Sequence, residues 1–533
     1  MSQLARRKAA RKKTAAARRE AEWQKRFGIA KNRDGSVTYG AAGGTYTDAA
    51  PSRGYDDWMT LTRSADYDTL PDRDALVGRA RDLDRNNPFA KSLRHTLVRE
   101  VVGKGIRPRP ARSARALGWK APRVRKYARN VSQIWNKWIP HAYVRGGTFG
   151  HLLRMTEAAL VRDGESFLHF VGLPESRHRP YRLSIDMIEA HRVSTPNDRR
   201  LRGRTIRDGV EINNVGAPIA IWVEIEDLQE SALFGDRVRS GNRSRWRRIP
   251  MMDDVSGLPN IVHVHDPDRP STRSVPLTAG ALDQIHVLGE FIEAELLAKK
   301  AEGCIAGAIT STMSDGLAAA SASGEFELEP GMMARLMPGE SITFLDPKRP
   351  GASYAPFVES MLRSIAFSCG LPYEVAFIAF SGMNYSNART TLLAAQRYFE
   401  MRQETLIEKL CRPAFCRLLW ESWQVGDLDV PNFPDLEQEL CSVGFIGQGF
   451  KWVDPAKETA ADVMQLENGL TSKSAILMRQ GVEFEDVVGD LLYEREVEES
   501  EGLAQKAPAM TPEDDTDDTD EDDDKKMEED EDA

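Results

Sequence analysis

The feature of the sequence that most constrains the fold is a pair of predicted helices that flank an insert of different composition. Apolar residues recur at helical spacing from Leu282 to Leu296 and again from Val358 to Cys369. The insert between the helices, residues 304–355, is rich in Ser, Ala and Gly and then shows short strand-like stretches around a Met337-Pro338-Gly339-Glu340 turn. If the insert returns on itself, the two helices are neighbours and form a stalk with a small β-containing tip.

The second of these helices leads into a loop and a long helix. Gly370 ends the helix, the loop Phe377–Asn384 follows, and helical spacing resumes over residues 386–423. Pro413 lies inside that spacing and lacks the N–H that a helix needs, so a kink is predicted there. The segment holds no histidine and no nucleophile paired with a base. Taken alone, it is typical of an αα-hairpin in a soluble core.

The first half of the chain is predicted to place helices before strands. Helical spacing begins at Pro71, breaks at Asn86-Asn87-Pro88 because a residue before proline disfavours the helical region, and resumes as far as Gly103. Further helices are predicted from Pro122 and over Leu152–Val161. Strand-like stretches follow at Glu165–Val171, Tyr181–Met187, Ile219–Ile225 and Ile261–His265. This order indicates an α+β domain.

Charge is distributed unevenly along the chain. Residues 1–26 hold ten Lys and Arg against two Glu, and residues 513–533 hold fifteen Asp and Glu against two Lys, although the net charge is only −9. Runs of like charge with few apolar residues cannot offset the entropy of ordering by burial, so both ends are predicted to be tails. The basic arm either binds nucleic acid or an acidic protein, or is simply solvated.

The composition is 41% hydrophobic and 29% charged, which is typical of a soluble globular protein. No apolar run approaches the roughly 20 residues that span a bilayer, and no signal peptide follows the basic start. We therefore expect no membrane contact and a cytoplasmic location in the cell that makes the protein. The cysteines lack the spacing of a zinc site or a disulfide framework and are predicted to be reduced core residues: Cys304, Cys369, Cys411, Cys416 and Cys441.

One group of candidate metal ligands lies on a predicted strand. His263 and His265 are two residues apart and point to the same face, with Asp266 or Asp268 nearby. This pattern allows a metal-dependent hydrolase, but no third histidine or cysteine lies at ligand spacing, and two half-buried strand histidines are the simpler interpretation. The sequence contains no GxxxxGK(S/T) phosphate loop and no GxSxG elbow, which argues against a phosphate-loop ATPase and a serine hydrolase.

A series of short strings follows a characteristic order along residues 60–490. The strings are Arg85-Asn86-Asn87, Asp163-Gly164-Glu165, Ile261-Val262-His263-Val264-His265 leading to Arg269-Pro270, Leu336-Met337-Pro338-Gly339-Glu340, Gly370-Leu371-Pro372-Tyr373-Glu374, Tyr385-Ser386-Asn387-Ala388-Arg389, and Trp452-Val453-Asp454-Pro455 leading to Lys457-Glu458. In this order they resemble the lambda type of bacteriophage portal protein. The segment Ser271-Thr272-Arg273-Ser274 departs from the Gly-Gln and Arg-Gly pairs of that family. The resemblance therefore does not predict the geometry of the turn at this position. The basic arm and the acidic tail lie outside the resemblance.

The resemblance implies a portal fold, which is an α+β architecture with a helical stem, a small β-containing clip, an α/β wing and a helical crown. Applied to this sequence, it implies a basic arm and linker at 1–59, a wing at 60–277, a first stem helix at 278–303, a clip at 304–355, a second stem helix at 356–376, a tunnel loop at 377–385, a long kinked wing helix at 386–424, a crown at 425–500 and a disordered acidic tail at 501–533.

The resemblance also implies a function without catalysis or a cofactor. Such proteins form a ring, usually of twelve subunits, at one capsid vertex, through which double-stranded DNA is packaged and ejected. We expect Phe377, Phe380, Ser381, Gly382, Met383 and Asn384 to face DNA, and Arg335, Glu340, Lys348 and Arg349 in the clip to dock the packaging motor.

The implied partners are the packaging ATPase (the large terminase subunit), the major capsid protein and head-completion or tail connector proteins. The implied location is the virion, after assembly in the host cytoplasm. A nucleic-acid-binding scaffold protein that acts through its basic arm remains the other alternative.

Overall fold

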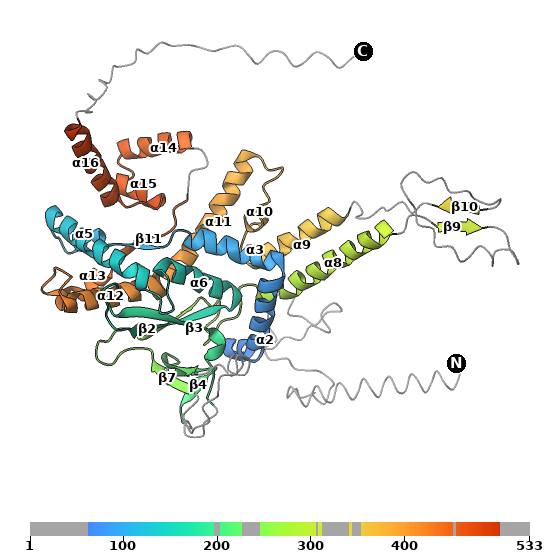
Figure 1. Cartoon of the computed structure of the whole chain (residues 1–533), viewed down its shortest axis with the longest axis horizontal. Helices are drawn as coiled ribbons and strands as arrows, with labels where there is room; N and C mark the ends of the chain where they lie inside the picture. Colours follow the sequence, from blue (N-terminus) through green and yellow to red (C-terminus); the bar gives the residue numbers. More distant parts are fainter. Residues whose placement is uncertain are drawn as a thin grey trace, which may run out of the picture. The chain divides into compact units, whose positions relative to one another are not determined.

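The computed structural model describes most of the chain between residues 62 and 501 (Figure 1). The described ranges are 62–196, 203–225, 246–304, 308–311, 340–343, 353–450 and 455–501. The predicted basic arm and the acidic tail lie outside these ranges, as do Arg335, Lys348 and Arg349 of the predicted clip. Glu340 is described by its backbone alone.

Helices α2 (Ala65–Asn86) and α3 (Pro88–Leu97) open the described part of the chain. The predicted break between them is confirmed. Asn87 caps α3, because its side-chain oxygen accepts hydrogen bonds from two backbone N–H groups of the first turn, at 2.9 and 3.3 Å. Helix α2 starts before the predicted Pro71, since the hydroxyl of Ser64 caps an earlier first turn.

The helices that follow bury one apolar face each. They are α4 (Pro110–Ala116), α5 (Ala121–Trp138) and α6 (Phe149–Arg162), after a π-helical turn η2 (Val98–Val102) and a short strand β1 (Arg107–Arg109). In α5, the helix predicted from Pro122, apolar residues at helical spacing are buried: Val124, Tyr127, Val131, Ile134 and Trp138. Trp138 also donates its indole N–H to the carbonyl of Leu183 at 2.9 Å, which joins α5 to the neighbouring sheet.

Two antiparallel sheets follow these helices. The first has the order β3-β2-β8 and the second the order β4-β5-β6-β7. Their bounds are β2 (Glu165–Gly172), β3 (Leu183–Ile188), β8 (Ile261–His265), β4 (Thr205–Arg207), β5 (Val210–Ile212), β6 (Pro218–Glu224) and β7 (Trp246–Pro250). Strand β2 faces two cores, because Leu168 packs with the helices while Phe167 packs with the second sheet. Figure 1 shows α6 on one side of β2 and β3, with β4 and β7 on the other.

The predicted stalk is present. Helices α8 (Leu282–Cys304) and α9 (Tyr354–Ser368) contact each other, and Figure 1 shows them side by side. The ring of Phe291 on α8 lies between Tyr354 and Phe357 of α9, at 5.8 and 5.1 Å between centroids. In the insert, β9 (Ala308–Ser311) pairs antiparallel with β10 (Glu340–Thr343). The insert therefore returns on itself as predicted.

The long helix is interrupted, in a form that the sequence did not specify. Helix α11 (Tyr385–Leu406) passes into a π-helical turn η8 (Ile407–Cys411) and then into α12 (Arg412–Val425). Pro413 lies in the first turn of α12. The backbone N–H of Arg412 bonds to the carbonyl of Ile407, and this wider turn shifts the hydrogen-bond register before the proline, which has no N–H to give.

The last elements are short helices and one strand pair. They are α13 (Phe433–Cys441), β11 (Gly444–Ile446, paired with β1), α14 (Pro455–Glu467), α15 (Lys473–Arg479) and α16 (Phe484–Ser500). Cys369, Cys411 and Cys441 are buried free thiols, as predicted. Within the described ranges, none of the helices combines the length and the hydropathy that a bilayer crossing requires.

Candidate functional site

The loop Phe377–Asn384 is fixed at both ends by residues that end or cap a helix. Before it, Gly370 ends α9 with φ +72°, and a short helix α10 (Tyr373–Ala376) follows. After it, Asn384 caps α11 by accepting a hydrogen bond from Asn387 N at 2.8 Å. The loop therefore begins and ends at fixed points on the core.

The predicted DNA-facing residues divide into two groups. Phe377 and Phe380 pack against the main core, and the ring of Phe377 meets Phe89 edge-on at 6.1 Å between centroids. These two aromatic side chains anchor the loop within this chain. By contrast, Ser381, Gly382 and Asn384 are exposed, and Met383 is half-buried. The exposed tip of the loop is thus shorter than the predicted set.

One exposed loop residue was missing from the prediction. Ile378 is 59% exposed and has φ +56°, a left-handed conformation that costs a β-branched residue roughly 1–3 kcal/mol. The turn is closed by the N–H of Ala379, which donates to the carbonyl of Glu374 at 2.9 Å. Periodicity and turn propensity give no signal for an isoleucine in this conformation, because only the backbone shows it.

The loop carries no ionisable side chain from Phe377 to Asn384. The nearest charges lie on the helices at its ends, where Arg363 of α9 approaches Glu374 at 3.9 Å. Farther along α11, Arg389 pairs with Glu458 of α14 at 3.5 Å. An exposed, uncharged and partly apolar tip can touch a polyanion without neutralising its phosphates.

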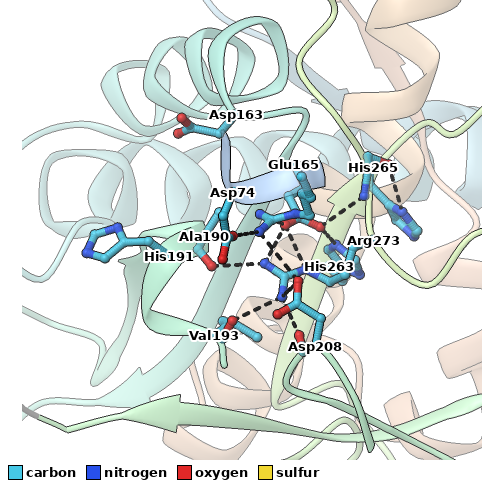
Figure 2. A network of polar contacts seen from close by, with 12 residues as sticks. Asp74, Asp163, Glu165, Ala190, His191, Val193, Asp208, His263, His265 and Arg273 are labelled. Carbon is cyan, nitrogen blue, oxygen red and sulfur yellow. Dashed lines mark hydrogen bonds and ion pairs between the residues drawn. The ribbon is translucent and has the colours of Figure 1, made fainter. Parts of the chain in front are cut away.

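A second polar centre lies in the interior and is built around Glu165 (Figure 2). Its carboxylate is fully buried and accepts hydrogen bonds from Arg73 at 2.5 Å, from Arg273 at 2.7 Å and from the His263 ring at 2.8 Å. Burial alone raises the pKa of Glu165, but Arg273, His263 and Arg73 together hold that pKa well below its usual value.

Arg273 connects this carboxylate to two other segments, the 3-10 turn η4 (Ala190–Arg192) with its C-cap and the turn between β4 and β5. Its guanidinium donates to the carbonyls of Ala190 at 2.9 Å and Val193 at 3.0 Å, and it pairs with Asp208 at 3.1 Å. Figure 2 shows these partners gathered around its guanidinium group. Arg273 is completely buried, and so are Ala190 and Val193, so its hydrogen bonds satisfy two backbone carbonyls that have little access to water.

The structure explains two of the sequence strings described above, Asp163-Gly164-Glu165 and Ser271-Thr272-Arg273-Ser274. A Cβ on Gly164, which has φ +85°, would lie 2.1 Å from the carbonyl oxygen of Val275, so the close approach requires glycine. Thr272 donates its N–H and its hydroxyl to the carboxylate of Asp66, at 2.6 and 2.7 Å. The geometry of this turn, which the sequence did not predict, is therefore fixed by its hydrogen bonds to Asp66 of α2.

The two histidines of the candidate metal group lie at the edge of this network. Their rings stack at 3.8 Å between centroids, so they share one face as predicted. Burial lowers the pKa of both, and that of His265 falls to about 3. The Nε2 atom of His263 is engaged by Glu165, while Asp266 and Asp268 are exposed. Among the described residues no group of three or more His, Cys, Asp or Glu side chains is arranged to hold a metal ion.

Comparison with known proteins places the chain in a family. Residues 52–403 match the family model described as phage portal protein, lambda family. The portal protein of Escherichia phage N15 is 25% identical over 482 residues, covering 84% of this chain and 88% of that protein. Portal protein B of Escherichia phage lambda is 25% identical over 487 residues, covering 85% and 89%.

Solved structures give a weaker likeness. The neck of an empty gene transfer agent (GTA) particle, computed with C6 symmetry, is 13% identical with a TM-score of 0.39, covering 77% of this chain and 93% of that chain. The neck of the native particle has a TM-score of 0.33, with 66% and 89% covered. The sequence match decides the family: the model covers well over half of the residues, and the chain belongs to the phage portal proteins of the lambda family.

Proposed function

We propose that this protein forms the portal ring at one vertex of a tailed-phage capsid, with a central channel through which DNA is packaged and ejected. Membership of the portal family supports the role, and the observation that carries the channel assignment is the exposed, uncharged tip between α10 and α11. Each phosphate that a protein neutralises adds affinity through counterion release, so a basic lining would hold DNA in place. An uncharged tip adds no such affinity, so DNA can slide past it.

The same proposal assigns the other regions. Helices α8 and α9 are the stem, the insert 304–355 is the clip, residues 60–277 are the wing, and 425–500 are the crown. The contact between α8 and α9 and the pairing of β9 with β10 support the stem and clip. The long helix formed by α11, η8 and α12 crosses from the loop into the wing core.

Exposed apolar side chains on the stem support assembly with a second copy. Phe367 on α9 is 70% exposed, and Leu296 and Leu297 on α8 are more than half exposed. Large apolar side chains exposed at both ends of the stem can take part in a contact with another subunit. We assign this contact to the neighbouring subunit of a ring, for which twelve copies is the expected number.

Further partners follow from the role. A separate packaging ATPase, the large terminase subunit, must supply the work, because the sequence has no phosphate loop. The clip, with Arg335, Glu340, Lys348 and Arg349, is the proposed docking site for this motor and later for head-completion or tail connector proteins. The wing faces the major capsid protein in this arrangement.

Electron microscopy of the purified full-length chain tests the proposal. Closed rings with a central hole are expected, and Phe367→Asp is expected to abolish them, since it places a charge in the apolar contact between copies. The variant should retain its thermal unfolding temperature as a monomer because Phe367 is mostly exposed. A wild-type protein that stays monomeric at micromolar concentration would contradict the proposal. Among the described residues no group of side chains is arranged to hold the metal ion that the hydrolase alternative needs. The basic arm on which the scaffold alternative depends lies outside those residues.

A further inference from the structure

Helix α5 exposes a face that carries only positive charge. Arg125, Lys126, Arg129 and Lys137 are exposed, and the helix contains no Asp or Glu. The opposite face is apolar and buried, so the helix cannot rotate to hide its cations. Since α5 is about 27 Å long at 1.5 Å per residue over its 18 residues, the face is a stripe rather than a single site.

The protein neutralises this face only in part. Lys126 pairs with Asp429 at 2.5 Å and Lys137 with Asp427 at 3.9 Å, both from the loop after α12. Arg125 has no carboxylate partner among the described residues, and the same holds for Arg129 in that part of the chain. Two guanidinium groups in the N-terminal half of α5 are therefore available to an anion.

A recess lies beside the stripe. It has a volume of about 200 Å³ and is lined by Trp119, Arg123, Lys126, Asp429 and Pro431. The Arg123 guanidinium lies over the Trp119 ring at 3.9 Å from its centroid, which keeps this cation at the rim of the recess. The face thus combines charge with a concave surface that can receive the side chains of an extended peptide.

The same chain supplies an acidic segment that can reach this face. Residues 513–533 carry fifteen Asp and Glu against two Lys. Helix α16, which precedes them, begins next to α4 because Arg115 forms an ion pair with Glu485, and α4 packs on α5. The tail leaves from the other end of α16, which is about 26 Å long at 1.5 Å per residue over its 17 residues. From Glu501 to Pro512 an extended chain spans up to about 40 Å, which is enough to return along α16 to α5.

We propose that residues 513–533 dock on the cationic face of α5 in the same chain. Tethering gives the tail a high effective concentration at that face, which a separate anion in solution does not have. Docking also covers unpaired guanidinium groups that would otherwise bind DNA phosphates, so the tail acts as an internal competitor for DNA. This inference concerns one chain and does not depend on the ring.

Zero-length cross-linking of the full-length protein tests the docking. A water-soluble carbodiimide joins a lysine amine to a carboxylate only where the two are in contact. The charge-preserving variant Arg125→Lys/Arg129→Lys is expected to give new cross-links from both positions to carboxylates in 513–533, located by mass spectrometry within a single chain. The matched control Arg79→Lys, on the exposed side of α2, is expected to give none.

A charge reversal provides the second arm. Arg125→Glu/Arg129→Glu is expected to remove the cross-links between Lys126 and the tail, and raising the salt concentration is expected to remove them in the wild type. Both substitutions lie on the solvent side, so circular dichroism and thermal unfolding serve as folding controls. Cross-links that persist in the reversed variant overturn the proposal, as do cross-links found only between two chains. If no cross-link reaches the tail while the reversal abolishes binding to duplex DNA, the face is a nucleic-acid site and the tail docking is wrong.

Discussion

The Glu165 network and the loop Phe377–Asn384 use opposite chemistry in one chain. In the network, ionised groups are fully buried and each pairs with several partners from different segments. In the loop, no side chain is ionisable, and the tip is exposed. Buried charge fixes the position of backbone, whereas an uncharged surface makes no lasting contact with a polyanion. The Glu165 network therefore holds segments of the core together, whereas the loop makes no ionic contact of its own.

Removing the central charge of the network should have the largest effect. Glu165→Gln leaves Arg73 and Arg273 buried beside a neutral amide, and breaking a buried ion pair from one side costs about 3–5 kcal/mol. The free energy of unfolding in urea measures this loss. Glu175→Gln, at an exposed position, is the matched control and should change stability by less than about 0.5 kcal/mol. A variant at Glu165 as stable as the control would mean that the network contributes little.

The pH dependence of stability comes next in size. His265 has a folded pKa of about 3, so the unfolded chain takes up a proton below pH 6.5 that the folded chain does not. The contribution of this histidine is therefore fully present above pH 6.5 and is lost as the pH falls towards 3, by about 1.4 kcal/mol per pH unit. His265→Phe keeps a ring in the stack and should flatten this slope in urea titrations between pH 6 and pH 4.

The control for that experiment is His178→Gln, because His178 is exposed. It should leave the slope unchanged. An identical slope in His265→Phe would show instead that the histidine is free to ionise in the folded protein. Glu165 adds to acid sensitivity only below about pH 4.5, where the unfolded chain takes up a proton that the folded chain, with its depressed pKa, does not.

On the loop side, a substitution should alter function more than stability. Gly382 has φ +80° and open space around its Cβ position, so Gly382→Val meets no atom but is strained by about 1–2 kcal/mol. We expect rings to form and the yield of DNA-filled heads to fall. The control Gly489→Val, in helix α16 with no positive φ, should leave both unchanged. Loss of ring assembly in Gly382→Val would show that the loop is structural.

The smallest effect is expected at Ile378, and it has the opposite sign. Ile378→Gly removes the cost of a β-branched residue at φ +56°, so stability should rise by up to about 1 kcal/mol in thermal unfolding. Ile378→Val, which keeps the branching, should give no gain. A destabilised glycine variant would indicate that the exposed side chain makes contacts that offset the strain.

Much of the fold was predictable because local patterns repeat over several turns. The break before Pro88 and the pairing of the two stalk helices follow from proline sterics and from an insert that returns on itself. The absence of charge in the loop could likewise be predicted, because the charge of a segment follows from its residue types alone. The family strings depended on order along the chain, and the match over residues 52–403 confirmed them.

Only the tertiary structure decided which residues act together. Glu165, Arg273 and Arg73 are separated by about a hundred residues in sequence and meet at hydrogen-bond distance, and no periodicity encodes such a meeting. It also decided that Phe377 and Phe380 anchor the loop while Ile378, between them in sequence, is exposed. The physical reason is that spacing and composition are local, whereas burial and left-handed backbone depend on everything packed around a residue.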